Sequence, residues 1–369
     1  MEAEIMNKVY IEKTNSIATL DIDKYKSSVC TIYNDKIFFW STYDKRLCSV
    51  DVNDYKISIE SACAEILNGS GEPARWMVTY EEFILTITGD CRQLIKYNPK
   101  NREFEIIKIS DEFIWWGHYI FATIWNECIF LFTKNPLQLK KINLITKDIV
   151  GVDLSVLASK NLEFVCGVRM KNEIFLFQRI GNQVLNYNLE TGQIVLNPID
   201  ISEIENAYVD QDDIYIIQGD GTLYRYCACC NQLQKIINRT KGKKYGMAIL
   251  GKKKIVELPS ASEDILIIDK KTEEVEVYEE YPKDFKYTNT SGRAKYYGYV
   301  EYKGTLIFPM RFSNYILMVD KQNSKLSWLI PQIPSKYEEG KFYVEVEKKT
   351  ATCSVVNSLD SFLKMILMR

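Results

Sequence analysis

One turn recurs seven times in this chain and constrains its fold more than any other feature. Each copy has an apolar or aromatic residue, then Asp or Asn, then five mostly polar residues and another apolar residue, as where Tyr187-Asn188 leads to Ile194. Cysteine replaces the Asp or Asn in one copy. The turn positions are Asp51, Asn98, Asn143, Asn188, Cys227, Asp269 and Asp320. Their mean spacing of about 45 residues is the length of one four-stranded propeller blade.

Each repeat also carries a strongly apolar second strand. These strands are predicted at Ile37–Trp40, Phe83–Ile87, Ile129–Phe132, Ile174–Phe177, Ile214–Ile217, Ile255–Leu258 and Leu306–Met310. Short strands with a reversal every 8–12 residues or so indicate antiparallel sheets rather than βαβ units. A linear array of hairpins would expose all seven apolar strands. We therefore predict an all-β fold, a single β-propeller of seven four-stranded blades.

The repeat resembles the kelch-like class of β-propellers, which includes the propeller domains related to galactose oxidase. The resemblance covers roughly residues 28–333, and the segment Tyr187–Gly192, read Tyr-Asn-Leu-Glu-Thr-Gly, is similar to the end of a kelch third strand. The paired glycines that close the second kelch strand are absent, as are the Trp-Asp dipeptides of WD repeats. The resemblance implies the propeller architecture and no particular activity.

Two terminal segments flank the predicted propeller of residues 28–333. Residues 1–27 contain a candidate closing strand, and residues 334–369 contain candidate closing strands and an amphipathic helix that begins at Ser358. The apolar stripe of this helix is Leu359, Phe362, Leu363, Ile366 and Leu367. If both ends contributed strands to a further sheet, the ring would have eight blades, so the sequence leaves the number open between six and eight.

Charge and cysteine content narrow the classes of partner. The chain has 47 basic and 49 acidic residues, a net charge of −2, which gives no basic field for nucleic acid or for an anionic membrane surface. No run of 18 apolar residues predicts a membrane span. The N-terminal residues contain no apolar run like the core of a signal peptide. We therefore expect a cytoplasmic protein in which the 10 cysteines are free thiols.

Few residues have the spacing of a metal or nucleophile site. His118 is the single histidine, which excludes a histidine-rich metal centre. Cys227-Ala228-Cys229-Cys230 is the only cysteine cluster, and no second cysteine pair follows at zinc-site spacing. We interpret the cluster as a diverged copy of the recurring turn, with a thiol-reactive or metal-binding surface site as the alternative. The prediction is therefore no metal and no cofactor.

Aromatic and basic residues between the blades form the candidate binding site. They fall near the first strand of a blade, where propeller segments gather around the central channel: Arg75, Trp76, Trp116, His118, Arg169, Arg293, Tyr296 and Arg311. Aromatic faces stack on sugar rings, and arginine binds hydroxyls or carboxylates through paired hydrogen bonds. The alternative interpretation is packing between blades, which we favour for Trp125 because it lies within a predicted strand.

These observations lead to two functional hypotheses. The first is a non-enzymatic binding scaffold that presents its inter-blade loops to a protein partner. The second is a propeller that binds a glycan or another polyhydroxylated ligand, or acts on it as a lyase or isomerase through tyrosine, arginine and carboxylate groups. The lack of a nucleophile motif argues against an enzyme. Convergence of Arg169, Arg293 and Arg311 on one funnel with Tyr296 or Trp116 would favour the ligand. Scatter of these arginines over the rim would favour the binding scaffold.

Overall fold

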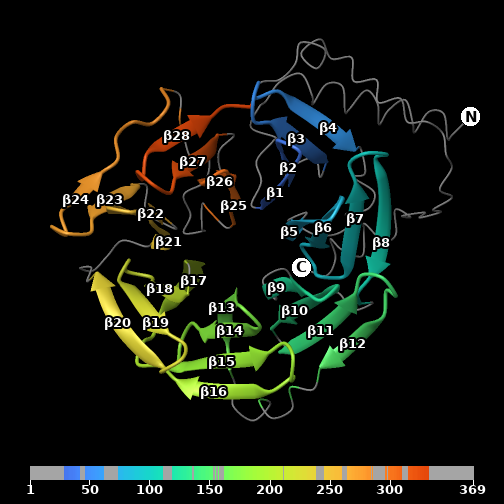
Figure 1. The fold of residues 1–369 in the computed structure, drawn as a ribbon, viewed down its shortest axis with the longest axis horizontal. Coiled ribbons are helices and arrows are strands. Elements are labelled where there is room, and N and C mark those ends of the chain that lie inside the picture. Colours follow the sequence, from blue (N-terminus) through green and yellow to red (C-terminus); the bar gives the residue numbers. More distant parts are fainter. Residues whose placement is uncertain are drawn as a thin grey trace, which may run out of the picture. The chain divides into compact units, whose positions relative to one another are not determined.

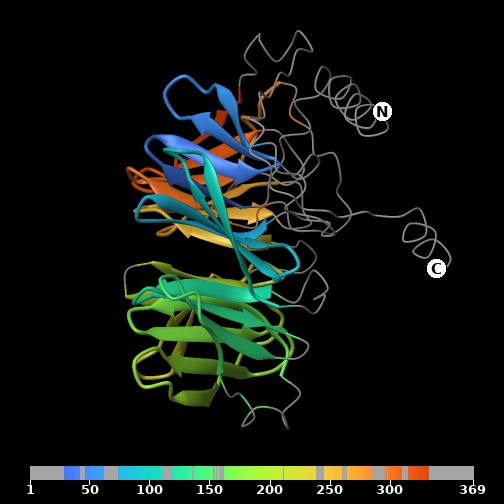
Figure 2. The same cartoon turned by 90° about the vertical axis from the view of Figure 1, so that its right-hand side faces the viewer.

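Over the residues that it describes, the computed structural model shows an all-β propeller with seven four-stranded antiparallel sheets, which confirms the predicted fold class (Figures 1 and 2). It describes residues 29–331 except 42–45, 62–73, 111–118, 135–136, 153, 155–156, 158–161, 211, 238–244, 260–263, 284, 286–295, 297 and 310–314. Residues 20–335 form one compact unit. The predicted closing segments 1–27 and 334–369, with the helix from Ser358, lie outside the described residues.

Every blade is built from four consecutive strands. The first strands are β1 (Cys30–Tyr33), β5 (Ala74–Tyr80), β9 (Tyr119–Trp125), β13 (Phe164–Met170), β17 (Ile204–Asp210), β21 (Tyr245–Leu250) and β25 (Val300–Tyr302). The second are β2 (Lys36–Trp40), β6 (Phe83–Thr88), β10 (Cys128–Thr133), β14 (Glu173–Gln178), β18 (Asp213–Gln218), β22 (Lys254–Pro259) and β26 (Thr305–Pro309). The third are β3 (Leu47–Asp51), β7 (Gln93–Asn98), β11 (Gln138–Asn143), β15 (Gln183–Asn188), β19 (Leu223–Cys227), β23 (Leu266–Asp269) and β27 (Ile316–Asp320). The fourth are β4 (Ile57–Ser61), β8 (Glu103–Lys108), β12 (Ile149–Val152), β16 (Ile194–Pro198), β20 (Gln232–Ile237), β24 (Val275–Val277) and β28 (Leu326–Leu329).

The recurring turn joins the third and fourth strands of every blade, because all seven predicted turn positions are the last residues of the third strands. In six blades the Asp or Asn side chain accepts the backbone N–H of the residue two positions later, as Asn188 does from Glu190 at 3.0 Å. The fifth residue of all seven turns has a positive φ: Tyr55, Arg102, Lys147, Gly192, Asn231, Glu273 and Ser324. One left-handed residue thus reverses the chain at the same place in all seven blades, and an Asp or Asn acceptor supports the reversal in six of them.

The second strands are apolar on both faces because each lies between two neighbouring blades. Their first core residue packs toward the preceding blade, as Ile174 of blade 4 packs with the third blade's Phe130. The next residue packs toward the following blade, as Phe175 packs with the fifth blade's Tyr226 at 6.3 Å between ring centroids. Seven buried clusters result, one at each interface between blades. Strands buried on both faces read as continuous apolar runs, which explains the sequence pattern.

The ring closes through contacts between blades 1 and 7 rather than through a shared sheet in the described part of the chain. Strands β1 and β25 are in contact, and Cys30, Ile307 and Leu329 belong to one buried cluster. The Cys30 thiol donates to the Ile307 carbonyl at 3.8 Å. Outside this cluster, Asp35 meets the Lys303 ammonium at 3.7 Å and accepts the Tyr302 hydroxyl. The closing interface is therefore built like the other six.

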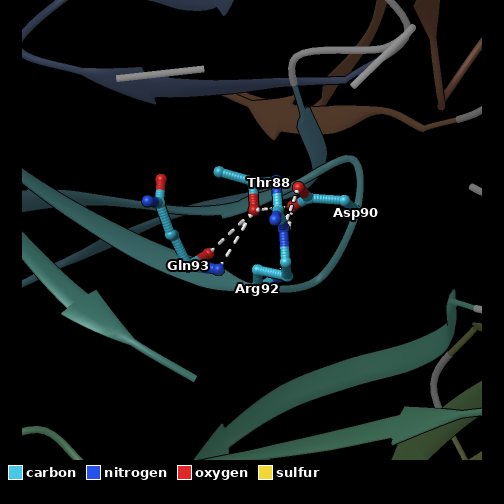
Figure 3. Close-up of polar contacts among 4 residues, drawn as sticks. All are labelled: Thr88, Asp90, Arg92 and Gln93. Carbon is cyan, nitrogen blue, oxygen red and sulfur yellow. Dashed lines mark hydrogen bonds and ion pairs between the residues drawn. The ribbon is translucent and has the colours of Figure 1, made fainter. Parts of the chain in front are cut away.

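A tight polar turn links β6 to β7 in blade 2 (Figure 3). The buried Asp90 carboxylate accepts the Thr88 hydroxyl at 2.7 Å, and from Arg92 it accepts the backbone N–H at 3.1 Å and Nε at 2.6 Å. The Thr88 oxygen in turn accepts the Gln93 backbone N–H at 3.1 Å. In the equivalent turn of blade 5, Asp220 accepts the backbone N–H of Thr222 at 2.8 Å.

The part of the chain that the structure describes includes no apolar helix of membrane-spanning length.

Candidate functional site

The candidate site is a cavity of about 690 Å³ against the first strands β5, β9 and β13, which belong to blades 2, 3 and 4. These strands lie toward the centre of the ring (Figure 1). The cavity wall comes from the later residues of each strand and from the turn that follows β9. Its lining residues are Trp76, Val78, Thr79, Tyr80, Ala122, Thr123, Ile124, Trp125, Asn126, Glu127 and Arg169. Indole, phenol, hydroxyl, amide, carboxylate and guanidinium groups therefore share one space.

Arg169 is held at the cavity by the neighbouring blade. It lies on β13, its side chain is exposed, and Nη1 donates a hydrogen bond to the carbonyl of Ile124 on β9. The guanidinium carbon lies 5.7 Å from the centre of the Trp125 ring, within cation–π range. The carbonyl uses one of the five N–H donors, and the others can serve a ligand.

The position of Arg169 follows from the repeat. Arg169 pairs across its hairpin with Ile174, and Thr79 pairs in the same way with Ile84, so the two residues occupy equivalent positions. Thr79 also donates to the carbonyl of the equivalent residue in the preceding blade, Ile32, at 2.6 Å. The same register position therefore donates a hydrogen bond to the preceding blade in blade 2, from Thr79, and in blade 4, from Arg169. In blade 4 the donor carries a positive charge.

A β-bulge precedes the cavity residues of all three strands. In β5, Ala74 and Trp76 pair with successive residues of β6, which leaves Arg75 as the extra residue. The extra residues of β9 and β13 are Ile120 and Val165, and β17 and β21 have bulges at the same place. Because a bulge reverses the side-chain alternation of its strand, it decides which side chains after it face the channel. The alternation of apolar residues in the sequence does not predict these bulges.

Tyr80 and Glu127 are the groups at the cavity with acid–base potential. Burial, and next the negative charges of Glu81 and Glu127, raise the pKa of Tyr80 above its ordinary value. The phenol is therefore neutral at physiological pH and acts as a hydrogen-bond donor or acceptor rather than as a phenolate base. Asn126 and Glu127 are exposed and form the turn between β9 and β10, where both have positive φ.

The structure brings two of the eight predicted site residues together, Trp76 and Arg169. Arg75 is the bulged residue of β5 and does not line the cavity. Tyr296 is buried in the core between blades 6 and 7, where its ring lies edge-on to the Phe308 ring with 6.1 Å between the ring centroids. A ligand role for Arg75 and Tyr296 stays a prediction. The other four predicted residues lie outside the described residues: Trp116, His118, Arg293 and Arg311.

Several residues that line the cavity are absent from the sequence-based prediction or have another role in it. Trp125 was interpreted as packing; it does contact the core between blades 3 and 4, and it also lines the cavity. The prediction does not include Tyr80, Asn126 and Glu127. A positional signal marks Tyr80 and Trp125, because each ends a first strand directly before a turn with positive φ.

A separate cluster of thiols lies at the outer turn of blade 5. The sulfur atoms of Cys227, Cys229 and Cys230 all lie within 4.8 Å of one another. The Cys230 and Cys229 thiols, followed by their backbone N–H groups, lower the pKa of Cys227 to about 7, whereas the adjacent Cys227 raises the pKa of Cys229 to about 11. The other five cysteines among the described residues are buried, and burial raises the pKa of one of them, Cys91, to about 12. The three turn thiols therefore differ from the single cysteines in exposure and in proximity.

Comparison with known proteins supports the fold alone. No protein-family model and no curated protein matches the sequence. A streptogramin B lyase structure is similar with a TM-score of 0.61 and 13% identity, over 84% of this chain and 96% of that one. The extracellular domain of a one-component system from B. thetaiotaomicron is similar with a TM-score of 0.59 and 12% identity, over 81% of this chain and 39% of that one. The computationally designed Ika8 protein gives a TM-score of 0.54 at 9% identity, over 84% and 87% of the two chains. These likenesses support a propeller and do not single out the kelch-like class.

Proposed function

We propose that this protein is a non-enzymatic binding propeller of kelch-like type, whose binding site is the cavity at β5, β9 and β13. The ligand that suits the cavity is a glycan or another polyhydroxylated compound that carries a carboxylate. The observation that carries the proposal is the meeting of Trp76, Trp125 and Arg169, from three different blades, at one cavity. The localisation proposed for this function is cytoplasmic.

The chemistry of the cavity favours such a ligand. Indole faces stack on the apolar faces of sugar rings, and the guanidinium of Arg169 can bind a carboxylate through two parallel hydrogen bonds. Asn126 and Glu127 add an amide and a carboxylate at the turn after β9, which can bind hydroxyl groups. The volume of about 690 Å³ is in the range of small-molecule sites.

The raised pKa of Tyr80, which lines the cavity, favours binding over catalysis. A lyase or isomerase that used Tyr80 as a base would need its pKa to fall toward neutral. Burial and the nearby carboxylates raise that pKa instead. Tyr80 is thus suited to hydrogen bonding with a ligand hydroxyl.

A second candidate function is a scaffold for a protein partner. Exposed apolar side chains on blades 2 and 3 favour it, since Ile106 is 45% exposed on β8, Val150 is 57% exposed on β12, and Ile145 is 65% exposed in the turn between β11 and β12. Lys147 of this turn forms an ion pair with Glu105 of β8, so the outer edges of the two blades are adjacent. Exposed apolar groups on neighbouring edges are typical of contact surfaces.

The test measures ligand binding by wild-type protein and by two matched arginine variants. Ligands found on an array of neutral and acidic glycans are titrated by calorimetry into Arg169→Ala and Arg225→Ala. Both arginines are exposed strand residues, but Arg225 lies on β19 and forms an ion pair with Asp213 at 2.8 Å. A hydrogen bond to a charged group contributes about 1.5–3 kcal/mol, so Arg169→Ala should weaken binding by about 10-fold to 100-fold. Arg225→Ala should bind as the wild type does.

Unchanged affinity in Arg169→Ala would reject the cavity as the site. If no glycan binds and a purified partner protein binds equally to both arginine variants, the scaffold function replaces the ligand-binding one. Trp125→Ala serves as a second variant, and its melting temperature is measured alongside because Trp125 also packs against the core between blades 3 and 4.

A further inference from the structure

The outer turn of blade 5 retains the geometry of the other six turns although cysteine replaces Asp or Asn. Cys227 ends β19 as Asn188 ends β15, and Asn231 has the positive φ of the fifth turn residue. Residues two and three positions after Asn188 donate their backbone N–H groups to its side chain, at 3.0 and 2.9 Å. The Cys227 sulfur takes the place of that acceptor oxygen. The turn therefore folds around the sulfur and places residues 229 and 230 next to it.

Both residues at those two positions are themselves cysteines. The Sγ atoms of Cys227 and Cys229 lie 3.0 Å apart, and the Cys230 thiol donates to the carbonyl of Cys227 at 3.9 Å. All three sulfurs lie within 4.8 Å of one another. In the described part of the chain, this is the one group of three or more potential metal-ligating side chains so close together.

We propose that the thiolates of Cys227, Cys229 and Cys230 form a binding site for one soft metal ion, Zn(II) or Cu(I). Zn–S bonds are about 2.3 Å long, so sulfurs that share a tetrahedral ion lie about 3.8 Å apart. Thiolate ligands select these metals over harder cations. Each thiol that binds the ion releases its proton to solvent. The site departs from the sequence-based expectation of no metal.

Three sulfurs also indicate the coordination. A redox disulfide needs two sulfurs, whereas a Zn(II) site has three or four protein ligands, and a third thiolate adds a ligand beyond the two that can hold Cu(I). With three protein ligands, Zn(II) keeps an open fourth position for water or an exogenous ligand, and Cu(I) is satisfied by three. Cys229 and Cys230 are exposed, so an ion can enter from solvent.

The test titrates metal into reduced protein under anaerobic conditions. Zn(II) is delivered from a chromophoric chelator and Cu(I) from bathocuproine disulfonate, to wild type and to Cys227→Asn and Cys229→Ser. Cys227→Asn restores the residue type of the sister turns while it removes one ligand, so the turn should fold. We expect one equivalent of Zn(II) or Cu(I) per wild-type chain, and an affinity lowered more than about 100-fold in both variants, because a lost ligand should cost more than a lost supporting hydrogen bond.

Two further variants exclude the cysteines outside the described residues. Cys63→Ser and Cys353→Ser should bind one equivalent with wild-type affinity. The proposal is overturned if neither ion binds at one equivalent, if Cys227→Asn and Cys229→Ser bind as tightly as the wild type, or if binding is lost in Cys63→Ser or Cys353→Ser. None of these outcomes depends on the cavity of blades 2 to 4.

Discussion

At the residue scale, the fifth position of the outer turn shows how the chain tolerates local strain. All seven residues there have φ between 52° and 72°, and Gly192 is the single glycine among them. A residue with a side chain pays roughly 1–2 kcal/mol for this conformation. The packing of the blade offsets that cost in the other six blades, and in five of them the Asp or Asn acceptor contributes as well. The turn is thus specified by the Asp or Asn at its start more than by glycine.

Gly192→Ala should lower the free energy of unfolding by about 1 kcal/mol, because alanine is strained at a φ of 72°. The new Cβ would meet no atom nearer than the Tyr187 hydroxyl at 3.9 Å, so steric overlap adds nothing. Urea denaturation measures the change. The control is Gly151→Ala on β12, where a Cβ meets nothing within 4 Å and φ is not positive, and where no loss is expected. Equal stability of the two variants would contradict the strain argument.

At the scale of the element, the hairpins of a blade differ in how much their turns contribute. The Asp90 carboxylate in the β6–β7 turn accepts hydrogen bonds from the Thr88 hydroxyl and from the backbone N–H and Nε of Arg92. In the counterpart turn of blade 5, the Asp220 carboxylate accepts the backbone N–H of Thr222. Arg92 also fixes the end of blade 2, because its carbonyl accepts the backbone N–H of Ile109 at 2.6 Å. The blade 2 turn therefore ties three strands together.

Asp90→Ala should cost about 1.5–3 kcal/mol of unfolding free energy, because it removes a charged acceptor and leaves the Thr88 and Arg92 donors without it. Asp220→Ala, the matched change in blade 5, should cost about 1 kcal/mol or less. Chemical denaturation of the two variants gives the comparison. A loss for Asp220→Ala as large as that for Asp90→Ala would show that the network contributes no more than one turn hydrogen bond.

At the scale of the whole molecule, the propeller is a ring of seven equivalent interfaces. The second core residue of each second strand packs toward the following blade, and Ile307 performs this role across the closing interface as Leu85 does between blades 2 and 3. The closing blades share no sheet among the described strands, so side-chain packing carries the closure there. The interface between blades 1 and 7 is therefore expected to unfold together with the other interfaces of the ring.

Ile307→Ala and Leu85→Ala should each destabilise the protein by about 2–5 kcal/mol, the range for truncation of a buried aliphatic side chain. Ile307 is 2% exposed and Leu85 is fully buried, so the two sites are closely matched. Both variants should unfold in a single transition by circular dichroism and by tryptophan fluorescence. A separate early transition in Ile307→Ala alone would mean that blades 1 and 7 part before the ring unfolds.

The sequence by itself determined the local elements of this protein. The seven turn positions, the apolar second strands and the four-stranded blades follow from interactions between residues a few positions apart: an Asx acceptor, a left-handed residue and the alternation of apolar side chains. The same local logic holds at Cys227, where a thiol replaces the usual oxygen and the turn still forms.

The tertiary structure alone decided the mode of closure and the cavity, and among the described residues it narrowed the predicted range of six to eight blades to seven. Trp76, Trp125 and Arg169 lie about 45 residues apart in sequence and meet because their first strands approach the same axis. The bulges of β5, β9 and β13 then select which side chains face the cavity, and no local pattern marks them. Contacts between blades depend on how seven sheets close into a ring, and the sequence of one repeat does not contain that information.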